Sequence, residues 1–228
     1  MTLTYVFPDL HGRLDHLTAA LTACNDDGMS TDDTMVFLGD YIDRGPDSSK
    51  VVAALRALST ERDRVICLSG NHEMMMIWAM HLGEKMVAQW VANGGDKALE
   101  SYTNPDGSID IDAMQDDGDW FMHLPAVHQD DHRVYVHAGV AGDWQNLDAE
   151  DLDTQTLHWH RYGALDCHGY RGKHVVHGHT PDTTGPVTFG NRTAMDVGAV
   201  WTGRYVVGVF DDDLPGGPVR VIEVHGKD

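Results

Sequence analysis

The sequence TMVFLGDYIDRG, residues 34–45, joins a short apolar run to a polar loop that contains glycine. A β-branched and aromatic run bounded by glycine indicates a strand, here from Thr34 to Leu38. The same order occurs from Leu3 to Phe7, followed by PDLHG, and from Arg64 to Leu68, followed by SGNHE. The first third of the chain therefore predicts three strands that each end in a polar loop.

Helical segments separate these strands. Apolar residues from Leu14 to Leu21 recur at helical spacing, and the segment from Ser48 to Leu58 begins with serines, which favour helix N-termini. A third helix, rich in methionine, is expected from about Met74, and we interpret Met74 to Met76 as core residues. Alternating strands and helices of this kind predict a parallel sheet.

The polar loops should meet at one edge of that sheet. Crossovers between parallel strands are right-handed, so the strand ends that carry these loops lie on the same side. Asp9, Asp40 and Asn71 each follow a strand and are spaced 31 positions apart, close to the ~30 residues of one strand–helix–strand unit. Ligands bind at this edge in open α/β sheets.

The second half of the chain has a different pattern. From about Glu84 to Leu124 it predicts helices broken at residues 93–95 and 104–107. Turns then join short strands, from which we expect a second, mixed or antiparallel sheet packed on the first. These strands are Val134 to Val136, His174 to Val176, Thr193 to Met195, Tyr205 to Phe210 and Val219 to Val224. Because no linker is evident, we predict a single α/β domain over residues 1–228, with two packed mixed sheets flanked by helices.

Composition excludes several classes of function. With 16 Lys and Arg against 36 Asp and Glu, the formal charge is −20, which argues against nucleic acid or an anionic membrane as a bulk partner. The longest apolar run has seven residues, whereas a bilayer span needs about 20. No signal peptide is expected. The cysteines are odd in number and widely spread, at Cys24, Cys67 and Cys167, which suits reduced thiols, so we predict a cytoplasmic protein.

The loops contain groups that could hold metal ions. Asp9 and His11 could share a cation, although such a pair is often only a turn aspartate and a surface histidine. Asp40, Asp43 and Arg44 form a stronger signal, with a salt bridge that pins a turn as the alternative. The sequence Asn-His-Glu at residues 71–73 offers three polar groups, or else a helix start.

Two histidines strengthen the metal interpretation. His137 and His179 follow separate predicted strands in the second half of the chain. Oxygen donors combined with imidazoles, without a convincing cysteine ligand, favour Mn²⁺, Fe²⁺ or Zn²⁺. One carboxylate can bridge two ions about 3.5–4 Å apart, a geometry that serves phosphoryl transfer.

Taken in order, GDYIDRG, GNHE, HAG and HGHTP resemble the motifs of the phosphoprotein-phosphatase branch of the calcineurin-like metallophosphoesterases. The length and the HGHTP motif also resemble the small bacterial and phage type, such as the phosphatase of phage lambda. The resemblance spans about residues 5–210, and its first two motifs are highly specific. One departure is Pro8, which stands where the family has glycine and could reshape the first loop.

The resemblance implies a role for each matching residue. Two divalent ions, Mn²⁺ first among the candidates, would be held by Asp9, His11, Asp40, Asn71, His137 and His179, with Asp40 as the bridge. Arg44, and by a looser match Arg161, would bind phosphate oxygens. A hydroxide bridging the ions would attack phosphorus directly, with His72 as the general acid paired with Asp43. We interpret Asp196 as structural and His177 as a non-ligand.

Three hypotheses follow. The first is a phosphomonoesterase that acts on phosphoserine or phosphothreonine in proteins and on small phosphoesters. The second is a dinucleoside polyphosphate hydrolase of the same family, against which the short chain argues, since those relatives are usually longer. The third is a catalytically silent metal-binding module, whose signature would be loss of a residue such as His72 or Asp43; both are present.

Overall fold

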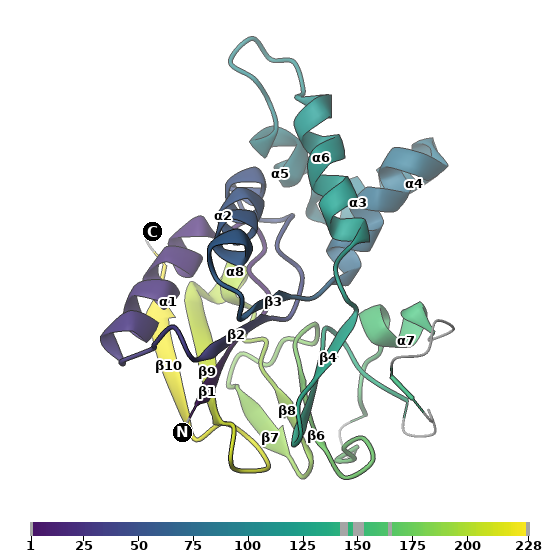
Figure 1. Ribbon diagram of the computed structural model, residues 1–228. Helices are drawn as coiled ribbons and strands as arrows, with labels where there is room; N and C mark the ends of the chain where they lie inside the picture. Colours follow the sequence, from purple (N-terminus) through teal and green to yellow (C-terminus); the bar gives the residue numbers. More distant parts are fainter. Residues whose placement is uncertain (1, 142–145, 148–152, 164–165, 227–228) are drawn as a thin grey trace.

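The computed structural model describes residues 2–141, 146–147, 153–163 and 166–226, and it contains two five-stranded sheets (Figure 1). In the first sheet the strands run in the order β10-β9-β1-β2-β3. Strands β1, β2 and β3 are parallel, as predicted, whereas β9 pairs antiparallel with β1 and with β10. The strands are β1 (Leu3–Phe7), β2 (Thr34–Phe37), β3 (Val65–Cys67), β9 (Arg204–Asp211) and β10 (Arg220–His225).

The second sheet has the order β4-β5-β6-β8-β7 and is also mixed. Its centre is parallel, with β6 between β5 and β8, and its two edge strands are antiparallel to their neighbours. The strands are β4 (Val127–Gln129), β5 (Arg133–Val136), β6 (His174–His177), β7 (Val187–Phe189) and β8 (Arg192–Ala194). The predicted α/β fold with two mixed sheets is therefore confirmed.

The placement of two predicted strands was wrong. The segments from Tyr205 to Phe210 and from Val219 to Val224 were expected in the second sheet, yet β9 and β10 complete the first. Val6 pairs with Gly208, and Val207 pairs with Ile222. The turns that precede β9 do not specify which sheet it joins, because that choice depends on contacts distant in sequence.

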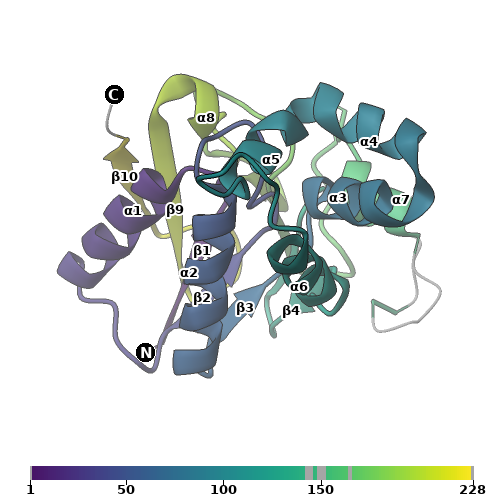
Figure 2. The same ribbon diagram turned by 90° about the horizontal axis from the view of Figure 1, so that it is seen from above.

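Some helices pack against the first sheet, and others gather at one end of the molecule. Figure 2 shows α1 beside β10 and β9, with α2 next to α1 and packed near β3, while α3 to α6 gather in the upper part of Figure 1. The helices are α1 (Leu14–Asp26), α2 (Ser48–Glu61), α3 (Asn71–Leu82), α4 (Glu84–Trp90), α5 (Asp96–Ser101), α6 (Ile111–Met122), α7 (Thr154–Trp159) and α8 (Ala199–Thr202).

The start predicted for the third helix is wrong, whereas the break predicted at residues 93–95 is confirmed. Helix α3 begins at Asn71 rather than near Met74, because the Glu73 carboxylate accepts the Gly70 N–H at 2.8 Å and supports the first turn. The expected break at residues 93–95 lies within a π-helical segment, η1 (Val91–Gly95), that joins α4 to α5. Gly94 supplies the non-helical step there with φ of 105°.

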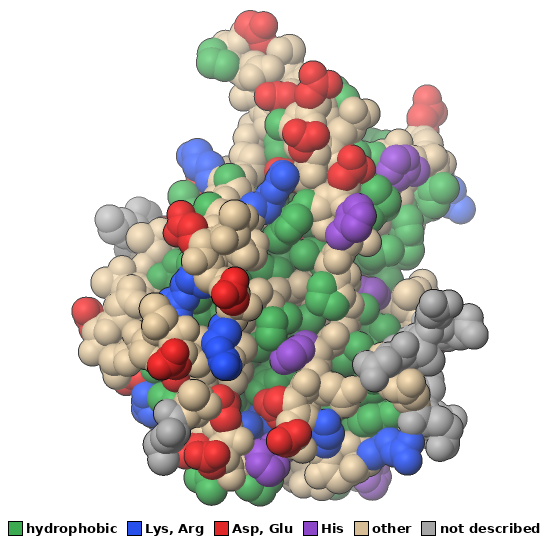
Figure 3. Space-filling view, viewed as in Figure 1, with side chains coloured by type: hydrophobic (Ala, Val, Ile, Leu, Met, Phe, Trp, Pro, Cys, Tyr) green, Lys and Arg blue, Asp and Glu red, His purple; other side chains and the backbone are tan. Residues whose placement is uncertain are grey.

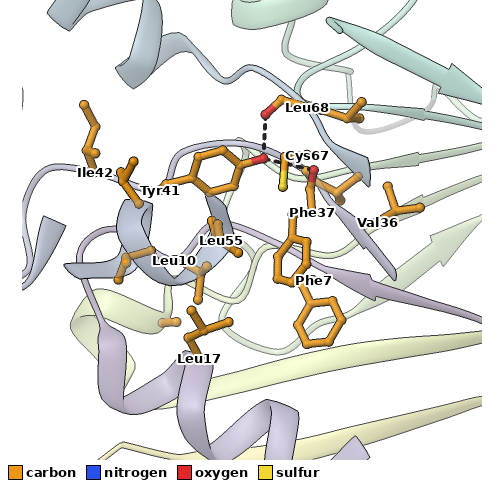
Figure 4. Packing of buried hydrophobic residues seen from close by; sticks show 14 of the residues in the cluster. Phe7, Leu10, Leu17, Val36, Phe37, Tyr41, Ile42, Leu55, Cys67 and Leu68 are labelled. Carbon is orange, nitrogen blue, oxygen red and sulfur yellow. Dashed lines mark hydrogen bonds between the residues drawn. The ribbon is translucent and has the colours of Figure 1, made fainter. Parts of the chain in front are cut away.

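A buried core fixes the loops that follow β2 and β3. Phe7 and Phe37 stack with ring centroids 4.4 Å apart, and both are fully buried. The Tyr41 hydroxyl, directly after Asp40, donates to the Leu68 carbonyl at 2.6 Å (Figure 4). Met75 and Met76 are buried in the same cluster, which confirms their interpretation as core residues.

The surface fits the acidic composition. On the face drawn in Figure 3, Lys and Arg lie apart from one another among Asp and Glu side chains. Among the described residues, no helix combines the length and apolar character that crossing a bilayer requires.

Candidate active site

The loops that follow the parallel strands of both sheets have an unusual backbone. Among the described residues, six non-glycine residues have left-handed φ angles. Arg171 lies elsewhere, and the other five lie in these loops: His11 (44°), Asp40 (55°), Asp43 (74°), Arg44 (68°) and His179 (65°). Residues with side chains seldom adopt this region, and each instance costs energy that surrounding contacts must offset. Such residues cluster at functional sites, and here all five belong to the predicted site.

Glu73 holds two of these loops together. Its buried carboxylate accepts backbone N–H groups from Asp40, Tyr41 and Gly70, each at 2.8 Å. These bonds join the loop after β2 to the start of α3, which carries Asn71 and His72. The first loop joins the same assembly because the N–H groups of Leu10 and His11 donate to the Asp40 carbonyl.

Lone pairs from both sheets converge beside Asp40. The Nδ1 atom of His137, which follows β5, lies 2.9 Å from the Leu38 carbonyl and donates to it, so Nε2 is left as an acceptor. That Nε2 lies 2.9 Å from Asn71 Oδ1 and 3.3 Å from Asp40 Oδ1. Asn71 Oδ1 is also 2.9 Å from Nδ1 of His179. Buried acceptors that face one another, such as His137 Nε2 and Asn71 Oδ1, are unfavourable unless a proton or a cation lies between them, and a metal ion would meet that requirement.

A second group lies on the other oxygen of Asp40. His11 Nε2 is 3.6 Å and His72 Nε2 is 3.8 Å from Asp40 Oδ2. His11 Nδ1 donates to the Ile42 carbonyl at 3.0 Å, so its Nε2 is also an acceptor, 2.5 Å from Nη1 of Arg44. The two oxygens of Asp40 thus face different clusters, which is the arrangement of a bridging carboxylate.

Asp9 borders these clusters without belonging to either compact group. Among the described residues, the metal-compatible triplets are His11 with Asp40 and His72, and Asp40 with His137 and His179. The buried Asp9 carboxylate accepts the His179 N–H, at 3.1 Å to Oδ1. Its charge helps to raise the pKa of Asp40, although burial is the larger cause. At the start of this loop the Pro8 carbonyl accepts the Tyr205 hydroxyl at 2.8 Å.

Burial sets the protonation states of the cluster. It lowers the pKa of His11 to about 3 and that of His179 to about 4, with Arg44 adding to both shifts. It also lowers the pKa of His137 well below the usual value. Neutral imidazole is the form that binds metal. Because burial raises the pKa of Asp40 and Asp9 well above the usual value, a cation between these groups would stabilise both carboxylates.

His72 lies in a hydrogen-bonded series behind the cluster. Its Nδ1 is 2.6 Å from Oδ2 of Asp43, and the indole N–H of Trp90 lies 2.9 Å from both Asp43 oxygens. Burial raises the pKa of Asp43 and lowers that of His72, whereas the Trp90 hydrogen bond opposes the shift of Asp43. The imidazole is therefore oriented with Nε2 toward the cluster, as proton transfer at that atom requires.

A small pocket gives access to these groups. Its volume is about 190 Å³. Its walls include Arg44, Arg161 and His72, together with three predicted metal ligands, Asp40, Asn71 and His179. Arg44 and Arg161 therefore face the same space, although Arg161 is exposed. Gln89 and Asn93 form another part of the wall. This arrangement places two guanidinium groups near any phosphate that enters the pocket.

The structure brings together all ten predicted site residues, and it adds some that the sequence interpretation missed. Glu73 was noted only as part of a polar triplet, and the contribution of Trp90 depends on a contact distant in sequence. His177 lies apart from the metal-compatible triplets, with Nε2 3.1 Å from Arg192 and Nδ1 3.1 Å from the Gly178 carbonyl. Asp196 accepts the Gly198 N–H at 2.8 Å, a contact that supports a turn.

Buried carboxylate, amide and imidazole groups at the strand ends of two mixed sheets fit the class of metallophosphoesterases. The family model described as calcineurin-like phosphoesterase matches residues 3–208. The chain therefore belongs to that family.

Individual relatives point to two activities. The chain is 28% identical over 149 residues to the symmetrical bis(5'-nucleosyl)-tetraphosphatase of Dechloromonas aromatica (strain RCB), covering 65% of this chain and 48% of that protein. It is 27% identical over 208 residues to serine/threonine-protein phosphatase 1 of Salmonella typhimurium (strain LT2), covering 88% of each. A crystal structure of a candidate diadenosine tetraphosphatase has a TM-score of 0.62 at 22% identity, over 100% of this chain and 95% of that one. The chain spans about half the length of the tetraphosphatases it matches.

Proposed function

We propose that the chain hydrolyses phosphoester or phosphoanhydride bonds with two divalent ions, Mn²⁺ first among the candidates. The observation that carries this proposal is the convergence of acceptor atoms on both oxygens of Asp40. Asp9, His11 and Asp40 would hold one ion, and Asp40, Asn71, His137 and His179 the other. When bound, the ions polarise phosphoryl oxygens and make water a stronger nucleophile near neutral pH.

His72 would donate a proton to the departing oxygen. Its hydrogen bond to Asp43 fixes the ring and stabilises the imidazolium form, and Trp90 in turn fixes the carboxylate of Asp43. Because Nε2 lies on the pocket side of the ring, 3.8 Å from Asp40, it can reach a leaving group bound beside the ions.

Arg44 and Arg161 would bind the phosphate oxygens. Phosphoryl transfer depends mainly on positioning and on offsetting charge at those oxygens, for which the planar guanidinium is suited. The left-handed backbone at Arg44 and its N–H bond to the Gly94 carbonyl at 3.0 Å direct this side chain toward the pocket.

As the substrate class we propose dinucleoside polyphosphates. Six of the curated relatives are symmetrical tetraphosphatases, at 28–30% identity. The short chain argued against this reading in the sequence, yet the matches favour it over the protein phosphatase. The protein phosphatase is the second candidate, because the Salmonella relative matches over most of both chains.

A substrate panel separates the two candidates. Purified protein with Mn²⁺ is given diadenosine tetraphosphate or a phosphoserine peptide at equal concentrations, and nucleotide and phosphate products are measured. Turnover of the dinucleotide with kcat/KM at least tenfold higher supports the first candidate, and the reverse ratio supports the second. If neither substrate, nor p-nitrophenyl phosphate, is hydrolysed with Mn²⁺, Fe²⁺ or Zn²⁺, the catalytic proposal fails.

A further inference from the structure

A larger groove adjoins the small pocket. Its volume is about 860 Å³, and it shares Arg44 with the pocket that contains His72 and Arg161. The loop after β2, the start of α1, helix α8 and the end of β10 form its walls. A molecule whose phosphate lies in the small pocket could therefore extend past Arg44 into this groove.

The most exposed aromatic surface of the groove is Trp201. This residue is 64% exposed, an unusual state for so large an apolar side chain. It lies on the short helix α8 between Gly198 and Gly203, whose φ angles are 65° and 67°. An added Cβ at Gly198 would lie 3.2 Å from Trp201 Cε3, so the backbone packs closely against the ring and restricts it.

Arg44 contacts both Trp201 and His11, a member of the metal-compatible triplets. Its guanidinium carbon lies 5.0 Å from the Trp201 ring centroid, within cation–π range, while its Nη1 reaches Nε2 of His11. One side chain thus contacts both the cluster and the ring. A substrate whose phosphate binds Arg44 would have its next groups beside Trp201.

Charge in the groove is largely balanced. Arg13 makes two hydrogen bonds to Asp15, at 2.8 and 2.7 Å, and Asp47 pairs with Lys50 at 2.7 Å. These pairs offset the charges that could otherwise recruit a phosphate chain. A flat, neutral group suits such a surface better than an anion, and aromatic rings stack on every kind of nucleobase.

We propose that the Trp201 groove binds the nucleobase of a nucleotide substrate, on the side of Arg44 away from the metal-compatible cluster. This inference rests on the proposed dinucleoside polyphosphate function and specifies how that substrate would be selected. Trp201 is a specificity residue in this account: it contacts substrate, and Arg44 keeps the phosphate in place.

The kinetic test compares Trp201→Ala and Trp201→Phe with the wild-type protein. The substrates are diadenosine tetraphosphate and glycerol phosphate, a phosphoester without an aromatic group. Trp201→Ala should raise the KM for diadenosine tetraphosphate, relative to the KM for glycerol phosphate, by about tenfold. Trp201→Phe keeps a ring, so its KM ratio should stay close to that of the wild-type protein. The control is Leu82→Ala at the end of α3, another apolar side chain that is 64% exposed, which should leave the ratio unchanged.

A binding test does not depend on turnover. Saturation-transfer NMR with adenosine, which lacks phosphate, should show transfer from protein to the adenine protons in the wild-type and Leu82→Ala proteins. The transfer should be lost in Trp201→Ala. This readout separates the groove from the reaction, because adenosine has no phosphate for Arg44 or a metal ion to bind.

The outcomes distinguish the two proposals. If diadenosine tetraphosphate is hydrolysed but Trp201→Ala changes neither the KM ratio nor the adenosine signal, the groove proposal is overturned and the function stands. If the dinucleotide is not hydrolysed while adenosine binding still requires Trp201, the substrate proposal fails and the base-binding surface stands. A selective rise in KM for a phosphoserine peptide in Trp201→Ala would identify a peptide groove and overturn nucleobase binding.

Discussion

The small pocket and the Trp201 groove, which share Arg44, differ in how their main groups are buried and paired. In the small pocket the key groups are buried, their pKa values are displaced by burial, and acceptor atoms face one another. In the groove the key ring is 64% exposed and the charged groups are paired with neighbours. Buried, mutually unfavourable groups are costly and persist where chemistry requires them, whereas an exposed ring can be replaced at little cost to folding.

This contrast explains why family membership does not identify the substrate. The motifs of the metallophosphoesterase family fall in the pocket, where the metal-compatible groups and His72 lie. Groups such as Trp201 lie outside them, on α8. We therefore expect reaction type and substrate choice to depend on different parts of the molecule, and substitutions should separate them.

The largest effect within the pocket is expected from His72→Asn. Removing the proton donor should lower kcat by about 10²–10⁴-fold while the protein stays folded, because the leaving oxygen then departs without general-acid assistance. The matched control is His123→Asn at the exposed end of α6, which should retain full activity. An unchanged rate in His72→Asn would remove His72 from the mechanism.

Trp90→Phe tests the support of that donor. The substitution removes the N–H that reaches both oxygens of Asp43, so we expect kcat to fall by about tenfold. Because the change acts through the pKa values of Asp43 and His72, the pH dependence of kcat should shift as well. Trp120→Phe on α6 serves as the control, and equal pH profiles in all three proteins would count against this role for Trp90.

Glu73→Gln tests how much Glu73 stabilises the fold by joining the loop after β2 to the start of α3. The carboxylate accepts three backbone N–H groups, and an amide would turn an NH₂ group toward at least one of them. We expect the free energy of unfolding to fall by about 2 kcal/mol in urea titrations. Glu61→Gln, at the exposed end of α2, should change it by no more than about 0.5 kcal/mol. Equal stabilities would mean that Glu73 does not hold the loops.

Gly94→Ala gives the smallest expected effect and tests whether η1 positions the Arg44 side chain. Both Gly94 and Gly107 have left-handed φ, at 105° and 87°, so alanine should cost about 1 kcal/mol at either position. Only at Gly94 would the new Cβ meet Arg44, at 2.6 Å from its Cγ, whereas nothing lies within 4 Å of Gly107. Gly94→Ala should therefore lower kcat/KM several-fold beyond Gly107→Ala, and identical kinetics would show that η1 does not position Arg44.

Local sequence patterns predicted much of the fold. The strands that end near Asp9, Asp40 and Asn71 are continuous apolar runs, and their parallel pairing follows from the helices between them. The pattern could not assign β9 and β10 to a sheet, because antiparallel strands joined by turns can extend either one. Nor could it place the start of α3, which depends on the hydrogen bonds of Glu73 to another loop.

The candidate site was predictable in part for the same reason. Motifs supplied the residues from Asp9 to His179, but their geometry is a product of tertiary contacts. Trp90 meets Asp43 across 47 positions, and Trp201 meets Arg44 from the far end of the chain. The contacts of both tryptophans with the site depend on the folded structure, so their roles could not be predicted from the sequence.

The central claim is that the acceptor atoms around Asp40 form a site for two metal ions. Metal-stripped protein is titrated with Mn²⁺ by calorimetry, and bound metal is then measured after gel filtration. We predict two ions per chain for the wild type and for Asp112→Asn, an exposed control on α6, with loss of at least one ion in folded Asp40→Asn. Binding of no metal by the wild type, or unchanged stoichiometry and affinity in Asp40→Asn, would contradict the account.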